Sequence, residues 1–173
     1  EADPLLRLAC LLKTKEAAQI FNKKYKLSNK EGKRLIAALD GIDSFTPLSG
    51  ENYMLETLYF KGVQTVRDQL YLYWAFRGFS GLGPRERALL SLVDQWHAQP
   101  AVFPLKGRDL IELNIKAGPE MGLLLKTIEK QWAEQGCVGT KEECLKVVSK
   151  LRAPSTSGQI NEMEIGGKTA AVD

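Results

Sequence analysis

The sequence predicts an all-α fold, and three observations support this prediction. Apolar residues recur at spacings of three and four along most of residues 1–152, which is the period of a helix with one buried face. No stretch of four or more residues alternates cleanly between apolar and polar side chains, as a half-buried strand would. Helix-start signals precede several of the apolar stretches. We expect a compact multi-helix array that ends in a C-terminal helical hairpin and a flexible tail.

The expected organisation has three parts. Residues 1–100 form a helical body region, residues 101–152 a C-terminal helical hairpin or tail region, and residues 153–173 a flexible tail. The last part is rich in Ser, Thr and Gly and has little apolar periodicity, so we expect it to play no role in the core.

The helices of the first part have recognisable beginnings. Asp3-Pro4 combines an N-cap with a proline at the first helical position. A short helix follows over residues 15–25. Ser28-Asn29-Lys30-Glu31 is a capping box, in which the serine and glutamate side chains satisfy free amides of the first turn. It starts a helix that Gly41 ends.

The later helices are predicted from the same signals. Ser49 is expected to begin a helix that Gly62 ends. The next helix points a stripe from Val63 to Arg77 toward the core. A second capping box at Thr140–Glu143 precedes the last helix, which reaches Leu151. The remaining predicted helices are one that Pro84 starts, with apolar residues up to Trp96, one over residues 108–113, and one that starts at Pro119, with apolar residues up to Trp132.

Length and composition favour a soluble domain of the cytoplasm. The 173 residues are 44% hydrophobic and 26% charged, and a chain of this size can bury a core without a disulfide or a metal. No apolar run approaches the roughly 18 residues of a membrane span. Three cysteines without a paired spacing indicate a reducing compartment, and Glu1-Ala2-Asp3 lacks the features of a signal peptide.

Positive charge is concentrated near the N-terminus. The net charge is only +3, but residues 13–34 hold eight basic and two acidic side chains, a local charge of +6. Such a segment could steer a polyanion toward the protein, and a merely solvated helix face is the alternative interpretation.

Catalytic or metal-binding patterns are missing from the sequence. His97 is the single histidine, and Cys137 and Cys144 lack the short paired spacing of a zinc site. There is no Walker A sequence and no dinucleotide-binding loop. Glu162 and Glu164 have the spacing of paired metal-binding carboxylates, but they lie in the predicted tail. We therefore expect no catalytic residue, metal site or cofactor in this chain.

Residues 103–126 read as a helix, a tight turn and a second helix. Gly107 permits the entry turn, and Asn114 suits a left-handed residue after the first helix. Gly118 and Pro119 start the second helix as N-cap and first residue. The segment is either a hairpin that only packs or a hairpin whose free amides at Gly118 hold a backbone phosphate, with basic side chains nearby.

The same segment resembles a known family. Gly-x-Asp-Leu at residues 107–110 and Gly-Pro-x-Met-Gly at residues 118–122 resemble the C-terminal part of bacterial CCA-adding enzymes, in the tRNA nucleotidyltransferase/poly(A) polymerase family. The segments at Leu58–Gly62 and Val66–Leu70 are similar to an earlier helical pair of that family, and the resemblance covers residues 4–151. Asn114 stands where many relatives have glycine, which is compatible with the turn.

The resemblance implies a helical region that holds the acceptor/TψC arm of tRNA through contacts to the backbone of A-form RNA. The implied partners are tRNA and the family's N-terminal catalytic half, with no membrane. Addition of CCA, of part of it or of poly(A), with Mg²⁺ and CTP or ATP, would belong to that half. No position here matches its motifs, so this chain alone is expected to be inactive.

Two sets of residues follow from these expectations. The candidate RNA-binding residues are Lys23, Lys24, Lys26, Lys30, Arg77, Arg85, Arg87, Lys106, Arg108 and Lys116. The residues expected to shape the hairpin turn are Gly107, Asp109, Asn114, Gly118, Pro119 and Gly122, the last of them leaving room where the two helices cross.

Two functions of other classes remain open. One is a stand-alone helical nucleic-acid-binding module, which would not prefer tRNA over duplex DNA. The other is a protein–protein interaction domain in which the basic segment is merely solvated.

Overall fold

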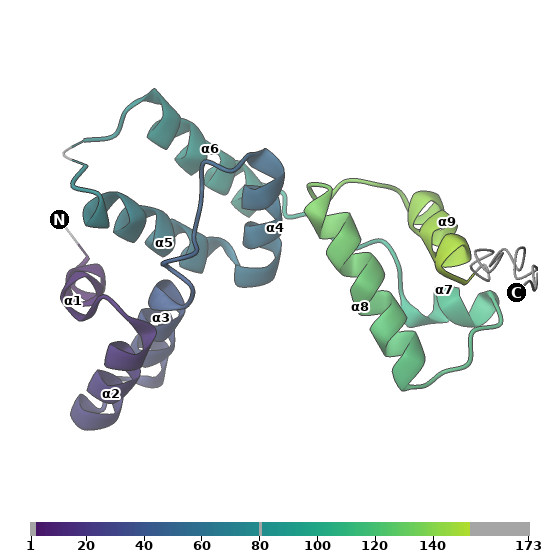
Figure 1. The fold of residues 1–173 in the computed structure, drawn as a ribbon, viewed down its shortest axis with the longest axis horizontal. Coiled ribbons are helices and arrows are strands. Elements are labelled where there is room, and N and C mark those ends of the chain that lie inside the picture. Colours follow the sequence, from purple (N-terminus) through teal and green to yellow (C-terminus); the bar gives the residue numbers. More distant parts are fainter. Residues whose placement is uncertain (1–2, 80, 153–173) are drawn as a thin grey trace, which may run out of the picture.

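The computed structural model describes residues 3–79 and 81–152, and this part of the chain contains nine α-helices and no strand (Figure 1). The all-α prediction is confirmed. The predicted flexible tail, residues 153–173, lies outside the described residues. The helices are α1 (Pro4–Leu12), α2 (Lys15–Tyr25), α3 (Asn29–Leu39), α4 (Glu51–Lys61), α5 (Val63–Phe76), α6 (Pro84–Ala98), α7 (Gly107–Glu112), α8 (Pro119–Glu134) and α9 (Lys141–Arg152).

Side-chain caps fix where several helices begin. Asp3 caps α1 by accepting the Leu5 N–H at 2.9 Å. The capping box before α3 is confirmed, since the Ser28 Oγ accepts the Glu31 N–H at 3.3 Å and the Glu31 carboxylate accepts the Ser28 N–H at 3.2 Å. The box before α9 is confirmed in the same way by Thr140 and Glu143. Each cap satisfies amides that have no partner within the helix.

The start of α4 and the end of α5 differ from the expectations. Helix α4 begins at Glu51 rather than at Ser49, because Gly50 is the N-cap and its φ of 127° belongs to a backbone conformation that favours glycine. Helix α5 ends at Phe76, so Arg77 is exposed instead of pointing into the core. Its guanidinium lies 3.8 Å from the centre of the Tyr73 ring, where it covers the aromatic face and stays in water.

The helices form two groups that meet at α4 (Figure 1). Helices α1–α6 lie on one side and α7–α9 on the other, and α4 packs against α5, α6 and α8. At this junction Tyr59 of α4 meets Trp132 of α8 edge to face, with ring centres 5.2 Å apart, and Phe103 lies 5.5 Å from the same tryptophan. No helix within the described ranges is long and apolar enough to cross a membrane.

The α2–α3 hairpin extends from the first group at the end that lies away from α7–α9 (Figure 1). It packs against α1 and α5, and its two helices pack closely on each other. Gly32 makes this close approach possible, because a Cβ at this position would lie 2.6 Å from the Asn22 side chain. Lysines near the turn are thereby brought together from both helices.

Candidate nucleic-acid interface

The turn between α2 and α3 holds a group of exposed cations, which we call the lysine tip. Its members are Lys23, Lys24, Lys26, Lys30 and Lys33. All five are exposed, and none forms an ion pair with a residue that the structure describes. Glu31, the one acid between Lys23 and Lys33, is engaged in the capping box. The lysine tip therefore presents unneutralised positive charge to solvent.

The backbone at the lysine tip adopts a conformation that lysine rarely takes. Lys26 is the C-cap of α2 with φ 51° and ψ 55°, and its N–H bonds the Asn22 carbonyl at 2.9 Å. A left-handed conformation costs a residue with a Cβ roughly 1–2 kcal/mol, a cost that glycine avoids. Two of the four non-glycine residues with positive φ in the described ranges, Lys13 and Lys26, belong to the basic segment.

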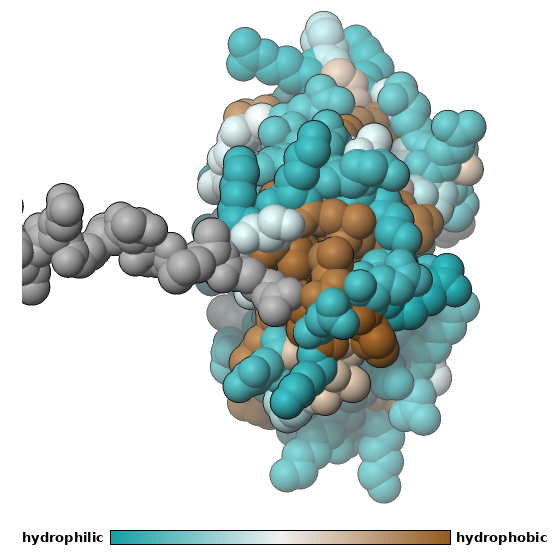
Figure 2. Space-filling view, turned by 90° about the vertical axis from the view of Figure 1, so that its right-hand side faces the viewer, coloured by the Kyte–Doolittle hydropathy of each residue, from teal (hydrophilic) through white to brown (hydrophobic). Residues whose placement is uncertain are grey.

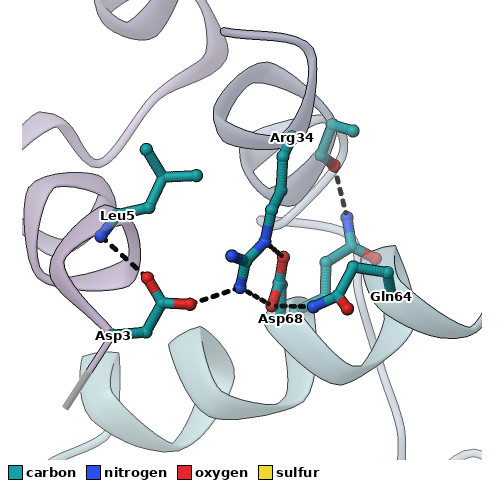
Figure 3. Close-up of polar contacts among 7 residues, drawn as sticks. Asp3, Leu5, Arg34, Gln64 and Asp68 are labelled. Atoms are coloured by element: carbon teal, nitrogen blue, oxygen red, sulfur yellow. Dashed lines mark hydrogen bonds and ion pairs between the residues drawn. The ribbon is translucent and has the colours of Figure 1, made fainter. Parts of the chain in front are cut away.

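A charged cluster of Asp3, Arg34, Gln64 and Asp68 anchors the hairpin to α1 and α5 (Figure 3). The Arg34 guanidinium donates to both oxygens of Asp68, at 2.7 and 2.8 Å, and to Asp3 at 2.6 Å. The Asp68 side chain is only 2% exposed, and it also accepts from Gln64 at 2.9 Å. Bidentate arginine–carboxylate pairs fix orientation as well as charge, so this cluster sets the direction in which the hairpin projects.

The cluster also changes the interpretation of the basic segment. Burial raises the pKa of Asp3, but hydrogen bonds from Arg34 and from the Leu5 amide outweigh this effect and lower the pKa below its usual value. Asp3 therefore stays ionised at neutral pH. Arg34, which the sequence counts within the local charge of +6, is neutralised by two carboxylates, and Lys15 pairs with Asp40. Among the described residues, the unpaired charge of the segment therefore lies on the lysine tip and on Lys13.

Tyr25 is a surface residue that the sequence reasoning missed. It lies among the lysines and is 59% exposed, and the Phe21 ring packs against its ring with centres 4.4 Å apart. The Lys24 ammonium lies 5.5 Å from its ring centre. Aromatic side chains interleaved with lysines are typical of single-stranded nucleic-acid binding, and this pattern is visible in the sequence from Lys23 to Lys26.

The second group of predicted residues surrounds the α7–α8 hairpin. Lys106, Arg108 and Lys116 are all exposed, and Arg108 lies 3.9 Å from the Asp109 carboxylate. Residues 106–122 contain three basic and three acidic side chains, so the hairpin has no net charge. Glu120 lies in the first turn of α8, next to the Gly118 N-cap. A negative side chain there already compensates the positive end of the helix and disfavours a phosphate.

Asp109 connects α7 to α9. Its carboxylate, 4% exposed, accepts the Lys106 N–H at 2.7 Å and the Lys141 ammonium at 2.7 Å. The hydrogen bond from Lys141 lowers the pKa of Asp109 most, and the Lys106 amide lowers it further against the opposing effect of burial. Asp109 is therefore an ionised, satisfied structural residue.

One glycine of this hairpin does not have the role expected of it, whereas Gly118 is the N-cap of α8 as predicted. Gly122 does not relieve a crossing, because a Cβ there would meet nothing within 4 Å. A Cβ on Gly107 would lie 3.4 Å from the Met121 methyl group, so the close approach of α7 and α8 occurs at Gly107. Asn114 has φ 58°, which is left-handed, and Gly118 with φ 163° is extended. Pro119 is the first residue of α8.

The third group consists of Arg77, Arg85 and Arg87. Arg77 stacks on Tyr73, whereas Arg85 and Arg87 are exposed near the start of α6, with Glu86 between them. The ten candidate RNA-binding residues thus belong to three parts of the fold, which are the α2–α3 turn, the region from the end of α5 to the start of α6, and the α7–α8 hairpin. Figure 1 shows that the α2–α3 turn and the α7–α8 hairpin lie far apart.

Metal ligands and reactive thiols are the remaining side chains that could carry chemistry. Within residues 3–79 and 81–152, no three His, Cys, Asp or Glu side chains are placed to hold a metal ion. Cys137 is buried, and burial together with the nearby Glu56 raises its pKa to about 11. A thiol with such a pKa is a poor nucleophile at neutral pH.

Comparison with known proteins assigns the family. A family model described as "tRNA nucleotidyltransferase domain 2 putative" matches residues 2–148, so the chain belongs to the tRNA nucleotidyltransferase family. It is also similar to the mouse and human proteins named "CCA tRNA nucleotidyltransferase 1, mitochondrial", with 35% identity over 65 residues. These matches cover 38% of this chain and 14% of each relative. The chain thus corresponds to a small part of those proteins.

Proposed function

We propose that this chain is a tRNA-holding region of a tRNA nucleotidyltransferase-family protein, and that the lysine tip is its main RNA contact. The observation that carries the proposal is a dense group of five exposed lysines, none of them ion-paired within the described residues, in a member of this family. In this proposal the acceptor arm is positioned here, while nucleotide addition takes place on a separate catalytic half that carries Mg²⁺ and CTP or ATP.

The proposed recognition acts mainly through the RNA backbone. Lysine ammonium groups are mobile point charges suited to phosphates, and they carry no base-edge code. Each neutralised phosphate releases counterions. Binding through five lysines therefore gives a slope of about −3.5 to −4.5 when the logarithm of the association constant K is plotted against the logarithm of the salt concentration. Preference for tRNA over other RNA then comes from the shape of the folded molecule.

A second candidate function is the binding of a partner protein, and an apolar surface on α7–α9 supports it. Figure 2 looks onto this side and shows a brown apolar area bordered by polar side chains. The exposed large apolar residues of these helices and their connecting loops are Ile111, Leu113, Leu123, Val138 and Leu151. Exposed apolar patches mark protein contacts. The catalytic half is the partner that fits this proposal, and such a contact is compatible with RNA binding elsewhere on the chain.

The test is fluorescence anisotropy of labelled tRNA lacking its 3′ CCA, titrated with the protein at low and moderate salt. Duplex DNA and an unrelated RNA hairpin serve as competitors. We expect binding that weakens with salt and that both competitors displace poorly. Equal binding to all three nucleic acids would indicate a general nucleic-acid-binding module. Absence of binding at low salt would contradict the proposal and favour the protein–protein function.

A further inference from the structure

Beside the lysine tip lies an aromatic ring that the fold leaves more than half exposed. Tyr25 is the last residue of α2, and the residue is 59% exposed. Phe21, one turn earlier on the same helix, packs against the ring with centres 4.4 Å apart and planes inclined by 35°. This contact restricts the ring, so Tyr25 presents a fixed aromatic surface to solvent.

Cations surround this surface. Lys24 and Lys26 flank Tyr25 in sequence, and the Lys24 ammonium lies 5.5 Å from the ring centre. Neither lysine forms an ion pair within the described residues, so both ammonium groups are available to phosphates. Lys26 keeps a left-handed backbone that glycine would adopt with less strain. Strained residues of this kind are concentrated at functional sites.

We propose that Tyr25 stacks on the base of an unpaired nucleotide of the bound RNA, while Lys24 and Lys26 contact the phosphates on either side of it. The proposal rests on the proposed RNA-binding function and adds the chemical class of the recognised element. The element is a nucleotide outside a duplex, because paired bases within an A-form helix do not expose their faces to a side chain. Stacking of this kind tolerates any base, since every base has a π-face.

An anionic membrane is the competing partner for a lysine-rich surface with exposed Ile20 and Tyr25. Helices that lie in a membrane interface present a broad apolar face with several large side chains. Helix α2 uses its apolar residues to pack on α1 and α3, and Ile20 and Tyr25 are its exposed large apolar side chains. The contacts therefore favour RNA, and membrane binding becomes an outcome of the test.

The experiment uses two short RNAs that share one duplex. The first is blunt, and the second carries a few unpaired nucleotides with 2-aminopurine, a base whose fluorescence is quenched by stacking. The proteins are the wild type, Tyr25→Ala, Tyr25→Phe and Phe60→Ala. Phe60 is an exposed aromatic on α4 that lies outside the lysine tip, so it is the matched control. Urea denaturation of each variant establishes that it is folded.

We expect Tyr25→Ala to weaken binding of the extended RNA by about 5- to 150-fold and to abolish the quenching. Blunt-duplex affinity and the salt slope should stay near the wild-type values, because the lysines remain. Tyr25→Phe should keep the quenching, and Phe60→Ala should behave like wild type.

Three results would overturn the inference, and they have different meanings. Salt-dependent binding with the same quenching in Tyr25→Ala would leave the lysine tip as an RNA site without stacking. Absence of RNA binding by the wild type would reject the proposed function itself. Binding of the same proteins to vesicles that contain phosphatidylserine tests the membrane alternative. If Tyr25→Ala lost vesicle binding and kept its RNA affinity, the surface would be a membrane contact.

Discussion

The two helical hairpins of this chain differ in how they use charge. Around the α2–α3 turn, residues 23–34 hold six basic side chains and one acidic one, and five of the cations form the lysine tip. Around the α7–α8 turn, residues 106–122 hold three of each sign. The α7–α8 hairpin has the more distinctive sequence motif, yet the α2–α3 hairpin has the surface suited to a polyanion. A conspicuous turn motif therefore indicates how a segment folds, and it does not by itself locate the contact surface.

The two turns also differ in which residue type adopts the left-handed backbone conformation. Each turn needs a left-handed residue, which is Lys26 in α2–α3 and Asn114 in α7–α8. Asparagine tolerates this conformation well, whereas lysine does not. The α7–α8 turn is thus built for stability, and the α2–α3 turn keeps a charge where stability alone would favour glycine.

The largest effect on stability is expected where the α2–α3 hairpin is anchored. Arg34→Met removes the cation that pairs with the buried Asp68 carboxylate, and an uncompensated buried charge costs about 3–5 kcal/mol. Urea denaturation measures the loss of unfolding free energy. Lys33→Met, on the same helix and without an ion pair in the described structure, should change it by less than about 0.5 kcal/mol. Equal effects of the two substitutions would mean that the cluster does not anchor the hairpin.

A smaller effect that depends on pH is expected in the α7–α8 hairpin. Because the folded pKa of Asp109 is lowered, its carboxylate stabilises the protein above the ordinary value of 3.8, and this contribution is lost as the pH falls through the folded pKa. Asp109→Asn should therefore lower Tm at pH 7, by an amount that shrinks in acid. Thermal melts between pH 7 and pH 2 test this, and a Tm difference that does not change with pH would contradict it.

The smallest effect is expected at the two left-handed turn residues. Lys26→Gly should raise the unfolding free energy by about 0.5–1 kcal/mol, because it relieves the left-handed strain, and it should also weaken RNA binding. Asn114→Gly should alter stability by only a few tenths of a kcal/mol, since asparagine already tolerates this conformation. Chemical denaturation and tRNA anisotropy on both variants make the comparison. Destabilisation by Lys26→Gly would show that the lysine side chain supports the fold.

Local signals in the sequence were sufficient to predict the helices. Asp3, Ser28 and Thr140 mark helix starts because a cap and its helix are adjacent in sequence. The start of α4 was mispredicted because its N-cap, Gly50, makes no side-chain hydrogen bond.

Contacts between distant residues could not be predicted in this way. Arg34 meets Asp68, 34 residues away, and Lys141 meets Asp109, 32 residues away. Without these pairs, Arg34 counts as surface charge and Asp109 as a turn residue only. Likewise, only the fold shows that the α2–α3 turn lies far from the α7–α8 hairpin (Figure 1).

The central claim is that RNA is held by the α2–α3 hairpin rather than by the α7–α8 hairpin. The most direct test is the dependence of tRNA affinity on salt for two triple variants, in which Lys23, Lys24 and Lys26, or Lys106, Arg108 and Lys116, are replaced by Gln. Each lost phosphate contact reduces the slope of log K against log salt by about 0.7–0.9. We expect the α2–α3 variant to lose about two units of slope, and the α7–α8 variant to stay near wild type. The reverse order, or equal losses, would contradict the claim.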